Sequence, residues 1–270
     1  MHLDRRLVRP GAVIAFADSG GDGRPVLLTH GAGMDHLMYD EQAAALLDAG
    51  HWVILWDLRG HGASSLSGRP FSARDALDDM RAVVEEVGAT PPVLVGHSLG
   101  GNLAQALVRE SPRVASALVV IDASWNAGPL TALERRALRL AAPMLSAVPA
   151  AWLPGMMARA SAVSPGAIER TRQTFARMPK AVFLDVWRAT VSLISPELGY
   201  RTPVPLALIR GGEDRTGNIA TAMPRWAAAE GIVEHIVPDA GHVVTWDAPA
   251  AVSAVLRRIL EEPRFRVPTR

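Results

Sequence analysis

Three side chains of the types that together activate a hydroxyl group stand far apart along this sequence. Ser98 lies in residues 96–100, Gly-His-Ser-Leu-Gly, which match the pattern G-x-S-x-G. A neutral serine hydroxyl is a poor nucleophile and needs a base, and our candidate is His242, which follows Asp-Ala-Gly at 239–241. A carboxylate must orient that base and stabilise its imidazolium form. With Asp214 in this role, the residues predict acyl transfer through an acyl-serine intermediate.

Two other carboxylates compete with Asp214 for the orienting role. Glu213 is its neighbour in the sequence, but we expect that side chain to point elsewhere. Asp122 directly follows a predicted strand and could also face the site. The order serine, aspartate, histidine is the one described for serine nucleophiles on strand-to-helix turns, and it favours Asp214.

The negative charge that develops on the carbonyl oxygen requires backbone N–H donors. We predict one from Leu99, directly after the serine, and one from Ala32 in the loop 30–33 (His-Gly-Ala-Gly), with Gly33 as the near alternative. His30 in the same loop is expected to be a packed structural residue. The residues expected beside the substrate belong to these loops or to a later aromatic-rich segment: Gly33, His97, Trp125 and Trp187.

The candidate residues directly follow short apolar runs that predict buried strands. The predicted strands are 3–9, 12–18, 25–29, 52–56, 93–95, 117–121, 206–209 and 233–237, and the predicted helices are 39–48, 75–87, 99–109, 219–229 and 249–260. Alternating strands and helices predict an α/β fold with a mainly parallel sheet and helices on both faces. In such sheets, active sites gather at the carboxyl ends of the strands, so the candidates can converge.

Residues 124–200 interrupt this alternation. The segment has little strand signal, several prolines and many Trp, Met and Phe residues, and we interpret it as a helical insertion. The expected organisation is therefore a core domain of residues 1–123 and 201–270 with a helical cap of residues 124–200. The Trp and Met side chains of the cap either line an apolar pocket or form its core.

Composition excludes several classes of function. The 270 residues carry 28 basic and 27 acidic side chains, a net charge of +1, which does not favour nucleic-acid binding. The absence of cysteine excludes disulfides, thiolate metal sites and a cysteine nucleophile. With no apolar run near about 20 residues and no apolar leader at the start, we expect a cytoplasmic protein that acts on a small molecule, needs no metal or cofactor and binds no membrane. A homo-oligomer stays open.

These motifs together resemble the α/β-hydrolase superfamily over essentially the whole chain. Residues 57–64, Asp-Leu-Arg-Gly-His-Gly-Ala-Ser, are similar to the D-x-R-G-x-G-x-S loop of its esterase-like and lactonase-like branch, where the loop is mainly architectural. The resemblance implies an eight-stranded sheet, a cap at about 124–200 and hydrolysis of a small to medium carboxylic ester or lactone. Ser98 argues against the related haloalkane dehalogenases, whose nucleophile is an aspartate.

Other chemistry on the same fold remains open at the level of sequence. The alternatives are hydrolysis of thioesters, cleavage of carbon–carbon bonds in diketone-like compounds, and perhydrolysis. A ligand-binding protein that has lost turnover is a further class, which the presence of Ser98, Asp214 and His242 disfavours.

Overall fold

A single eight-stranded sheet organises the computed structural model, which describes residues 1–88 and 90–265. The order across the sheet is β1-β2-β4-β3-β5-β6-β7-β8. The pairs β1·β2 and β2·β4 are antiparallel, and all later pairs are parallel, so the predicted mainly parallel sheet is confirmed. The strands are β1 (Arg5–Arg9), β2 (Ala12–Asp18), β3 (Pro25–Thr29), β4 (Trp52–Trp56), β5 (Val93–His97), β6 (Ala117–Ile121), β7 (Leu206–Gly211) and β8 (His235–Val237).

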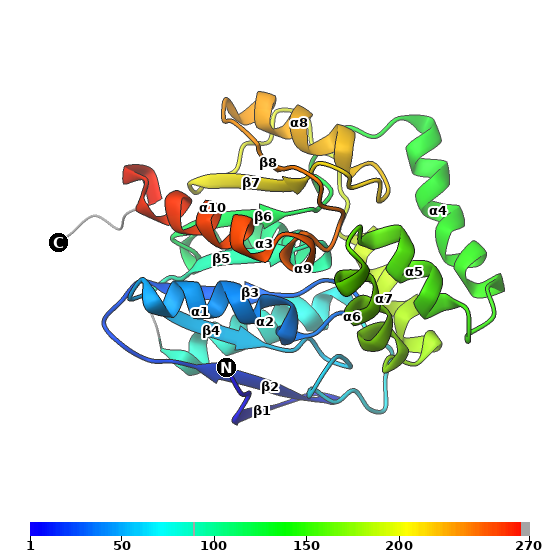
Figure 1. The fold of residues 1–270 in the computed structure, drawn as a ribbon, viewed down its shortest axis with the longest axis horizontal. Helices are drawn as coiled ribbons and strands as arrows, with labels where there is room; N and C mark the ends of the chain where they lie inside the picture. The colour runs from blue at the N-terminus through cyan, green and yellow to red at the C-terminus, as the bar shows by residue number, and fades with distance from the viewer. Residues whose placement is uncertain (89, 266–270) are drawn as a thin grey trace.

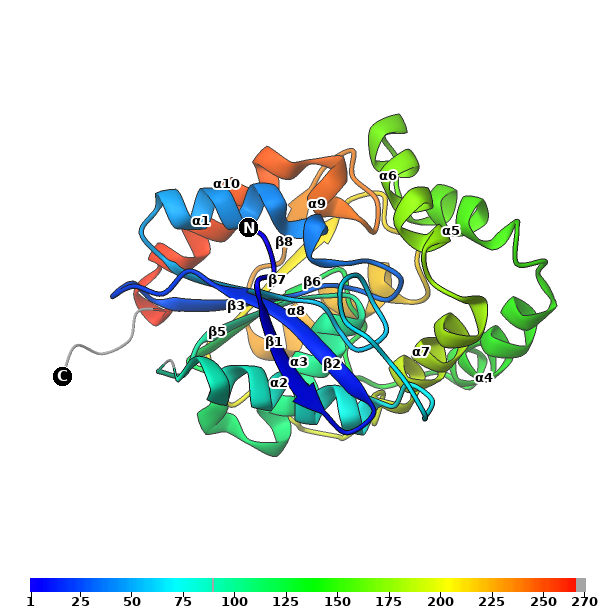
Figure 2. The same cartoon turned by 90° about the horizontal axis from the view of Figure 1, so that it is seen from below.

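Helices cover both faces of the sheet (Figures 1 and 2). Helices α1 (Asp40–Asp48) and α10 (Pro249–Glu261) pack on one face, and α2 (Ala73–Val87), α3 (Leu99–Glu110) and α8 (Ile219–Glu230) pack on the other. Successive strand residues point to opposite faces: Val26 and Leu28 of β3 join the first hydrophobic core, and Leu27 joins the second. This double burial explains why the central strands are continuous apolar runs.

Four helices lie between β6 and β7 in the sequence and pack beyond one end of the sheet (Figure 2). They are α4 (Ala132–Ala147), α5 (Leu153–Ser161), α6 (Pro165–Ala176) and α7 (Lys180–Ser192). We call α4–α7 the helical insertion. Its side chains line a cavity together with residues that follow the parallel strands, among them Ser98 and His242. The division into a core domain and a cap domain stays a prediction.

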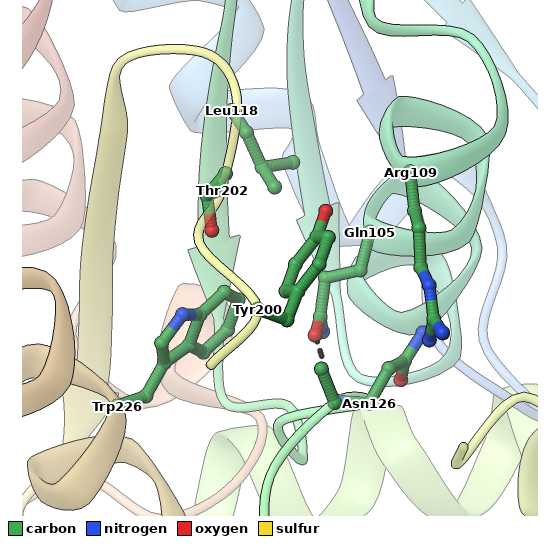
Figure 3. A pocket seen from close by; sticks show the side chains of 8 residues that line it. Gln105, Arg109, Leu118, Asn126, Tyr200, Thr202 and Trp226 are labelled. Atoms are coloured by element: carbon green, nitrogen blue, oxygen red, sulfur yellow. Dashed lines mark hydrogen bonds between the residues drawn. The ribbon is translucent and has the colours of Figure 1, made fainter. Parts of the chain in front are cut away.

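The two connections to the insertion lie side by side. The N–H groups of Ser195 and Glu197 donate to the carbonyl oxygens of Asn126 (2.8 Å) and Ala127 (2.9 Å). On α3, Oε1 of Gln105 accepts the backbone N–H of Asn126 at 2.9 Å (Figure 3). The segment that leads into the insertion and the segment that leads out of it therefore lie next to each other. Hydrogen bonds between their backbones join them.

Some boundaries differ from the prediction by one or two residues. Strand β8 begins at His235 rather than at 233. Helix α8 ends at Glu230, Gly231 after it has the left-handed conformation, and the chain needs the next residues to turn back. Helix α2 begins two residues early, at Ala73, because Ser72 accepts the N–H of Asp75 and caps it. The shorter elements are α9 (Val244–Asp247) and the 3₁₀ turns 36–39, 112–114 and 263–265.

Across residues 1–88 and 90–265, we find no helix with both the length and the apolar character needed to cross a membrane.

Candidate active site

Ser98 sits on a sharp turn between β5 and α3. Its backbone has φ 50° and ψ −117°, a strained conformation for a residue with a side chain. The turn requires glycines where backbones approach closely: a Cβ on Gly96 would lie 2.4 Å from the carbonyl oxygen of Gly100, and one on Gly100 would lie 2.3 Å from that of Thr29. The strained backbone and the two glycines make a sharp turn between β5 and α3, and the serine hydroxyl projects from this turn.

Ser98, His242 and Asp214 form a hydrogen-bonded chain. Nε2 of His242 lies 3.0 Å from Oγ of Ser98, and its Nδ1 lies 3.0 Å from Oδ2 of Asp214. All three residues follow strands at the same end of the sheet, although Asp214 lies 116 positions after Ser98 in the sequence. The Asp214 carboxylate accepts the Nδ1–H of His242, which leaves the Nε2 lone pair facing the serine hydroxyl.

Asp214 is buried yet ionised. Burial by itself raises the pKa of a carboxyl group. The charge of His242, its hydrogen bond and the N–H of Thr216, 2.7 Å from Oδ1, outweigh that effect and lower the pKa of Asp214 to about 2. The site therefore holds a fixed negative charge against the imidazole.

The two rival carboxylates lie in different surroundings. Glu213 is exposed, and its carboxylate pairs with Arg215 at 3.2 Å. Asp122 is fully buried, and its Oδ1 accepts the N–H of Gly211 at 2.9 Å. Atoms of Asp122, Asp214 and His242 lie within 4.8 Å of one another, but the hydrogen bond to the imidazole goes to Asp214. Since Nδ1 of His242 is occupied as a donor, we assign no metal to this group.

The loop 30–33 lies next to the serine. Ala32 lines a cavity together with Ser98, and Leu99 is the first residue of α3, whose N–H has no partner within the helix. His30 is buried: its Nδ1–H donates to the carbonyl oxygen of Gly31 (2.8 Å), and its Nε2 accepts the N–H of Leu58 (2.9 Å). This histidine fixes the loop to the segment after β4.

Gly33 is placed for packing rather than for contact with a ligand. It has φ 74°, and a Cβ there would lie 2.4 Å from the ring of Phe175 on α6. The absence of a side chain lets the helical insertion close over the loop.

His97 lines the cavity beside Ser98 and binds the backbone of His242. It is buried, and its Nε2–H donates to the carbonyl oxygen of His242 at 2.7 Å. Burial, followed by the charge of His242, lowers the pKa of His97 to about 3. A neutral His97 therefore fixes the loop that carries His242.

Two cavities meet at Ser98. The smaller has a volume of about 50 Å³, and its wall includes Ala32, Met34, His242 and Val243. The larger has a volume of about 330 Å³ and is mostly apolar, with Leu138, Val191 and Ile194 in its wall. Three residues line both cavities: Ser98, Trp187 and Thr216. The predicted substrate contact Trp187 thus lines both compartments.

The other tryptophan predicted to contact substrate, Trp125, lies elsewhere. Its ring stacks on Trp226 of α8, with centroids 6.1 Å apart and planes 3° apart. It lines a groove on the outer face with Tyr200 and Arg201, and neither cavity at Ser98 includes it. We therefore do not carry Trp125 forward as a substrate contact.

Sequence reasoning missed Asp247, the last residue of α9. Its carboxylate accepts the N–H groups of Val163 (3.0 Å) and Ser164 (2.8 Å) from the helical insertion and that of Gly241 (2.9 Å) beside His242. We call this arrangement the Asp247 clamp. The only sequence signal was an acidic residue five positions after His242, which has no meaning until the insertion is placed.

The segment 57–64 is architectural here as well. Asp57 is buried, and its carboxylate accepts hydrogen bonds from Nδ1–H of His36 (3.0 Å) and from the backbone N–H of Ala63 (2.7 Å). Arg59 is also buried and forms a hydrogen-bonded ion pair with Asp79 of α2 at 2.7 Å. The segment contributes no residue to either cavity at Ser98.

Comparison with known proteins gives the class to which this fold and site belong. Residues 26–255 match the model of the alpha/beta hydrolase family, and the chain belongs to that family. It is thus a hydrolase with the eight-stranded sheet that the sequence predicted.

Similar proteins carry several activities. 3-Oxoadipate enol-lactonase 2 of Acinetobacter baylyi is 24% identical over 274 residues, which cover 95% of this chain and 98% of the relative. A solved esterase from Thermogutta terrifontis has a TM-score of 0.78 and 26% identity, with 95% of this chain and 98% of that chain covered. A non-heme haloperoxidase of Rhodococcus erythropolis is 36% identical over 107 residues, which are 39% of each chain.

Proposed function

We propose that this chain hydrolyses carboxylic esters through an acyl-enzyme on Ser98. The observation that carries the proposal is the hydrogen-bonded chain from Oγ of Ser98 through His242 to the ionised Asp214, with 3.0 Å at each step. The enol-lactonase and esterase relatives support it. A cytoplasmic location and a small-molecule substrate are part of the same proposal.

The chemistry follows from the arrangement. Nε2 of His242 takes the proton of the Ser98 hydroxyl as Oγ attacks the carbonyl carbon. The oxyanion is stabilised by the N–H groups of Leu99 and Ala32. His242 then gives its proton to the leaving alcohol as the carbon–oxygen bond breaks. Water, deprotonated by His242, attacks the acyl-serine, and the acid leaves while Ser98 regains its hydrogen.

Replacing the nucleophile tests the proposal. Ser98→Ala should lower kcat for a p-nitrophenyl ester by roughly a millionfold, the scale seen when a serine nucleophile is removed, and it should abolish labelling by a fluorophosphonate probe. Ser146→Ala, on the exposed surface of α4, is the matched control and should keep full activity. Labelling that persists in Ser98→Ala would rule out this nucleophile. The same assay is run with thioesters, lactones and diketones, and with peroxide added. It shows whether kcat/KM for any of these reactions exceeds that for ester hydrolysis.

The two cavities indicate how an ester divides across Ser98. His242 must reach the leaving oxygen to protonate it, and His242 lines the smaller cavity but not the larger. We therefore place the alcohol in the compartment of about 50 Å³, with room for roughly three to five atoms of water size, and the acyl group in the apolar compartment of about 330 Å³. A lactone, whose two halves form one ring, fits this division less well than an open ester.

Matched ester series test this orientation. Among ethyl esters, each added acyl methylene that is buried should raise kcat/KM by about fourfold, because one buried CH₂ is worth about 0.8 kcal/mol. Among acetates, a longer alcohol should lower kcat/KM. Ala141→Trp, which fills the larger cavity from α4, should remove the preference for long acyl groups. Ala147→Trp, exposed on the same helix, should keep it. A preference for long alcohols on short acids would reverse the assignment.

A further inference from the structure

Asp122 is a buried carboxyl group that the proposed mechanism does not use. It directly follows β6, has no exposed surface and adopts φ 44°, in the left-handed region that a residue with a side chain rarely enters. Its backbone N–H donates to the carbonyl oxygen of Ile209 (3.0 Å), and its Oδ1 accepts the N–H of Gly211 (2.9 Å). Both partners belong to β7, the strand that leads to Asp214, so the carboxyl group is fixed against the base of that loop.

The second oxygen of Asp122 has no N–H donor among the described residues. Among these residues, Oδ2 is buried without a hydrogen-bond partner. An oxygen of the Asp214 carboxylate lies within 4.8 Å of an oxygen of Asp122. Two ionised carboxylates this close inside a protein are strongly disfavoured, so we expect the pair to retain one proton. Asp214 accepts two hydrogen bonds, from His242 and Thr216, whereas Asp122 accepts one. The proton therefore belongs on Asp122.

The surrounding charges agree with this distribution. Burial, followed by the charge of Asp214, raises the pKa of Asp122 well above its ordinary value. Arg210 acts in the opposite direction, but its guanidinium pairs with Glu234 at 2.8 Å, which partly offsets its charge. Tyr39, which also interacts with Asp122, is a neutral phenol, because burial raises its pKa. His242, the remaining charged group nearby when protonated, is bonded to Asp214.

We propose that Asp122 is a carboxylic acid whose O–H donates to the carboxylate of Asp214 and holds that carboxylate in line with His242. Asp122 is thus a positioning residue that touches neither substrate nor serine. This role rests on the function proposed above, whereas the protonation state of Asp122 does not. With the donor in place, Asp214 has three hydrogen bonds, which fix its side chain.

The protonation state can be measured without any activity. In protein labelled with ¹³C at the aspartate carboxyl carbons, one resonance should keep the chemical shift of a protonated acid at neutral pH. That resonance should be absent from Asp122→Asn. If all aspartate carboxyl carbons have the shift of an ionised carboxylate at pH 7, the proposal fails, whatever the enzyme hydrolyses.

Kinetics of two matched variants test the positioning role. In Asp122→Asn the amide oxygen can accept the N–H of Gly211 and the amide N–H can replace the acid O–H, so kcat and the acid limb of the pH profile of kcat/KM should stay within about twofold of wild type. Asp122→Leu keeps the branched shape and the number of side-chain heavy atoms but has no donor. It should lower kcat by roughly tenfold or more, with little change in KM, because a charge-assisted hydrogen bond is lost.

The pH profile separates this role from the alternatives. If Asp122 were ionised, Asp122→Asn would remove a negative charge near His242 and displace the acid limb to lower pH. If Asp122 were merely structural, Asp122→Leu would lower thermal stability but leave kcat of the folded fraction unchanged, as quantified by fluorophosphonate labelling. Either result would overturn the proposal. Absence of ester hydrolysis in wild type would instead refute the proposed function.

Discussion

At Asp214, hydrogen bonding outweighs the cost of burying a charge. The carboxylate is almost fully buried, yet the charge of His242, the imidazole N–H and the N–H of Thr216 keep its pKa near 2. Its neighbour Glu213 is exposed and pairs with Arg215. One position along the loop therefore separates a carboxylate that can order an imidazole from one that is solvated.

This difference predicts opposite outcomes for two amide substitutions. Asp214→Asn should lower kcat by about 10⁴, the scale reported for loss of the orienting acid in serine triads, because an amide no longer fixes the productive tautomer. Glu213→Gln should leave kcat unchanged. Steady-state kinetics on the preferred ester would decide between them, and a large effect of Glu213→Gln with none of Asp214→Asn would contradict our assignment of the acid.

Among the elements, buried strands were the most predictable from sequence. Strands such as β3 and β6 have every residue buried, so their apolar runs are unbroken and their ends are marked by polar residues. Because Ser98 and Asp214 follow such strands, β5 and β7, and His242 follows the edge strand β8, their convergence was predictable as well. The short edge strand β8 was predicted two residues too long, since Val233 is apolar but 79% exposed.

The helical insertion was predictable only as a segment. Trp125 and Trp187 were both predicted to contact substrate, yet one stacks on Trp226 of α8 and the other lines both cavities at Ser98. Their roles depend on how α4–α7 pack on the core, which no local pattern encodes. The same holds for Asp247, whose partners Val163 and Gly241 meet only after the insertion has folded. Residues that act across two packed elements were therefore the ones that sequence analysis missed or misplaced.

For the whole molecule, buried neutral histidines link stability to pH. Burial lowers the pKa of His30, and burial followed by a neighbouring histidine charge lowers those of His61 and His97 to about 3. Each binds a proton near pH 6.5 when the chain is unfolded but not when it is folded. The unfolded state thus binds more protons below about pH 6.5, and stability falls as the pH falls toward 3. The raised pKa values of Asp122 and Asp35 oppose this trend.

His61 offers a test of this linkage. It is buried, and its Nδ1–H donates to the carbonyl oxygen of Arg59 at 3.0 Å. His61→Gln should reduce the loss of unfolding free energy between pH 6 and pH 5 by about 1.4 kcal/mol, the contribution of one proton per pH unit. Urea denaturation at a series of pH values measures this slope. The exposed His2 provides the control, because His2→Gln should leave the slope as in wild type, and an unchanged slope in His61→Gln would contradict the linkage.

The Asp247 clamp has a consequence for how substrate enters and product leaves. Lifting α5 and α6 from the core would break the bonds from Val163 and Ser164 to Asp247, as well as the bond from the N–H of Val243 to the carbonyl oxygen of Ser161. At about 1.5 kcal/mol or more for each bond to a charged group, such an opened state would be scarce and would disturb His242.

Within the part of the chain that the structure describes, the α4 side has fewer hydrogen bonds to the core. There, Glu134 accepts a hydrogen bond from Asn218 at 3.0 Å, at the wall of the larger cavity. Movement of α4 would open that cavity while the α5–α6 side keeps its bonds to Asp247. Several hydrogen bonds thus fix the wall beside the reacting groups, whereas the wall of the larger cavity, where we propose that the acyl group binds, has fewer. Exchange of reactant and product through the α4 side would leave the bonds around His242 intact.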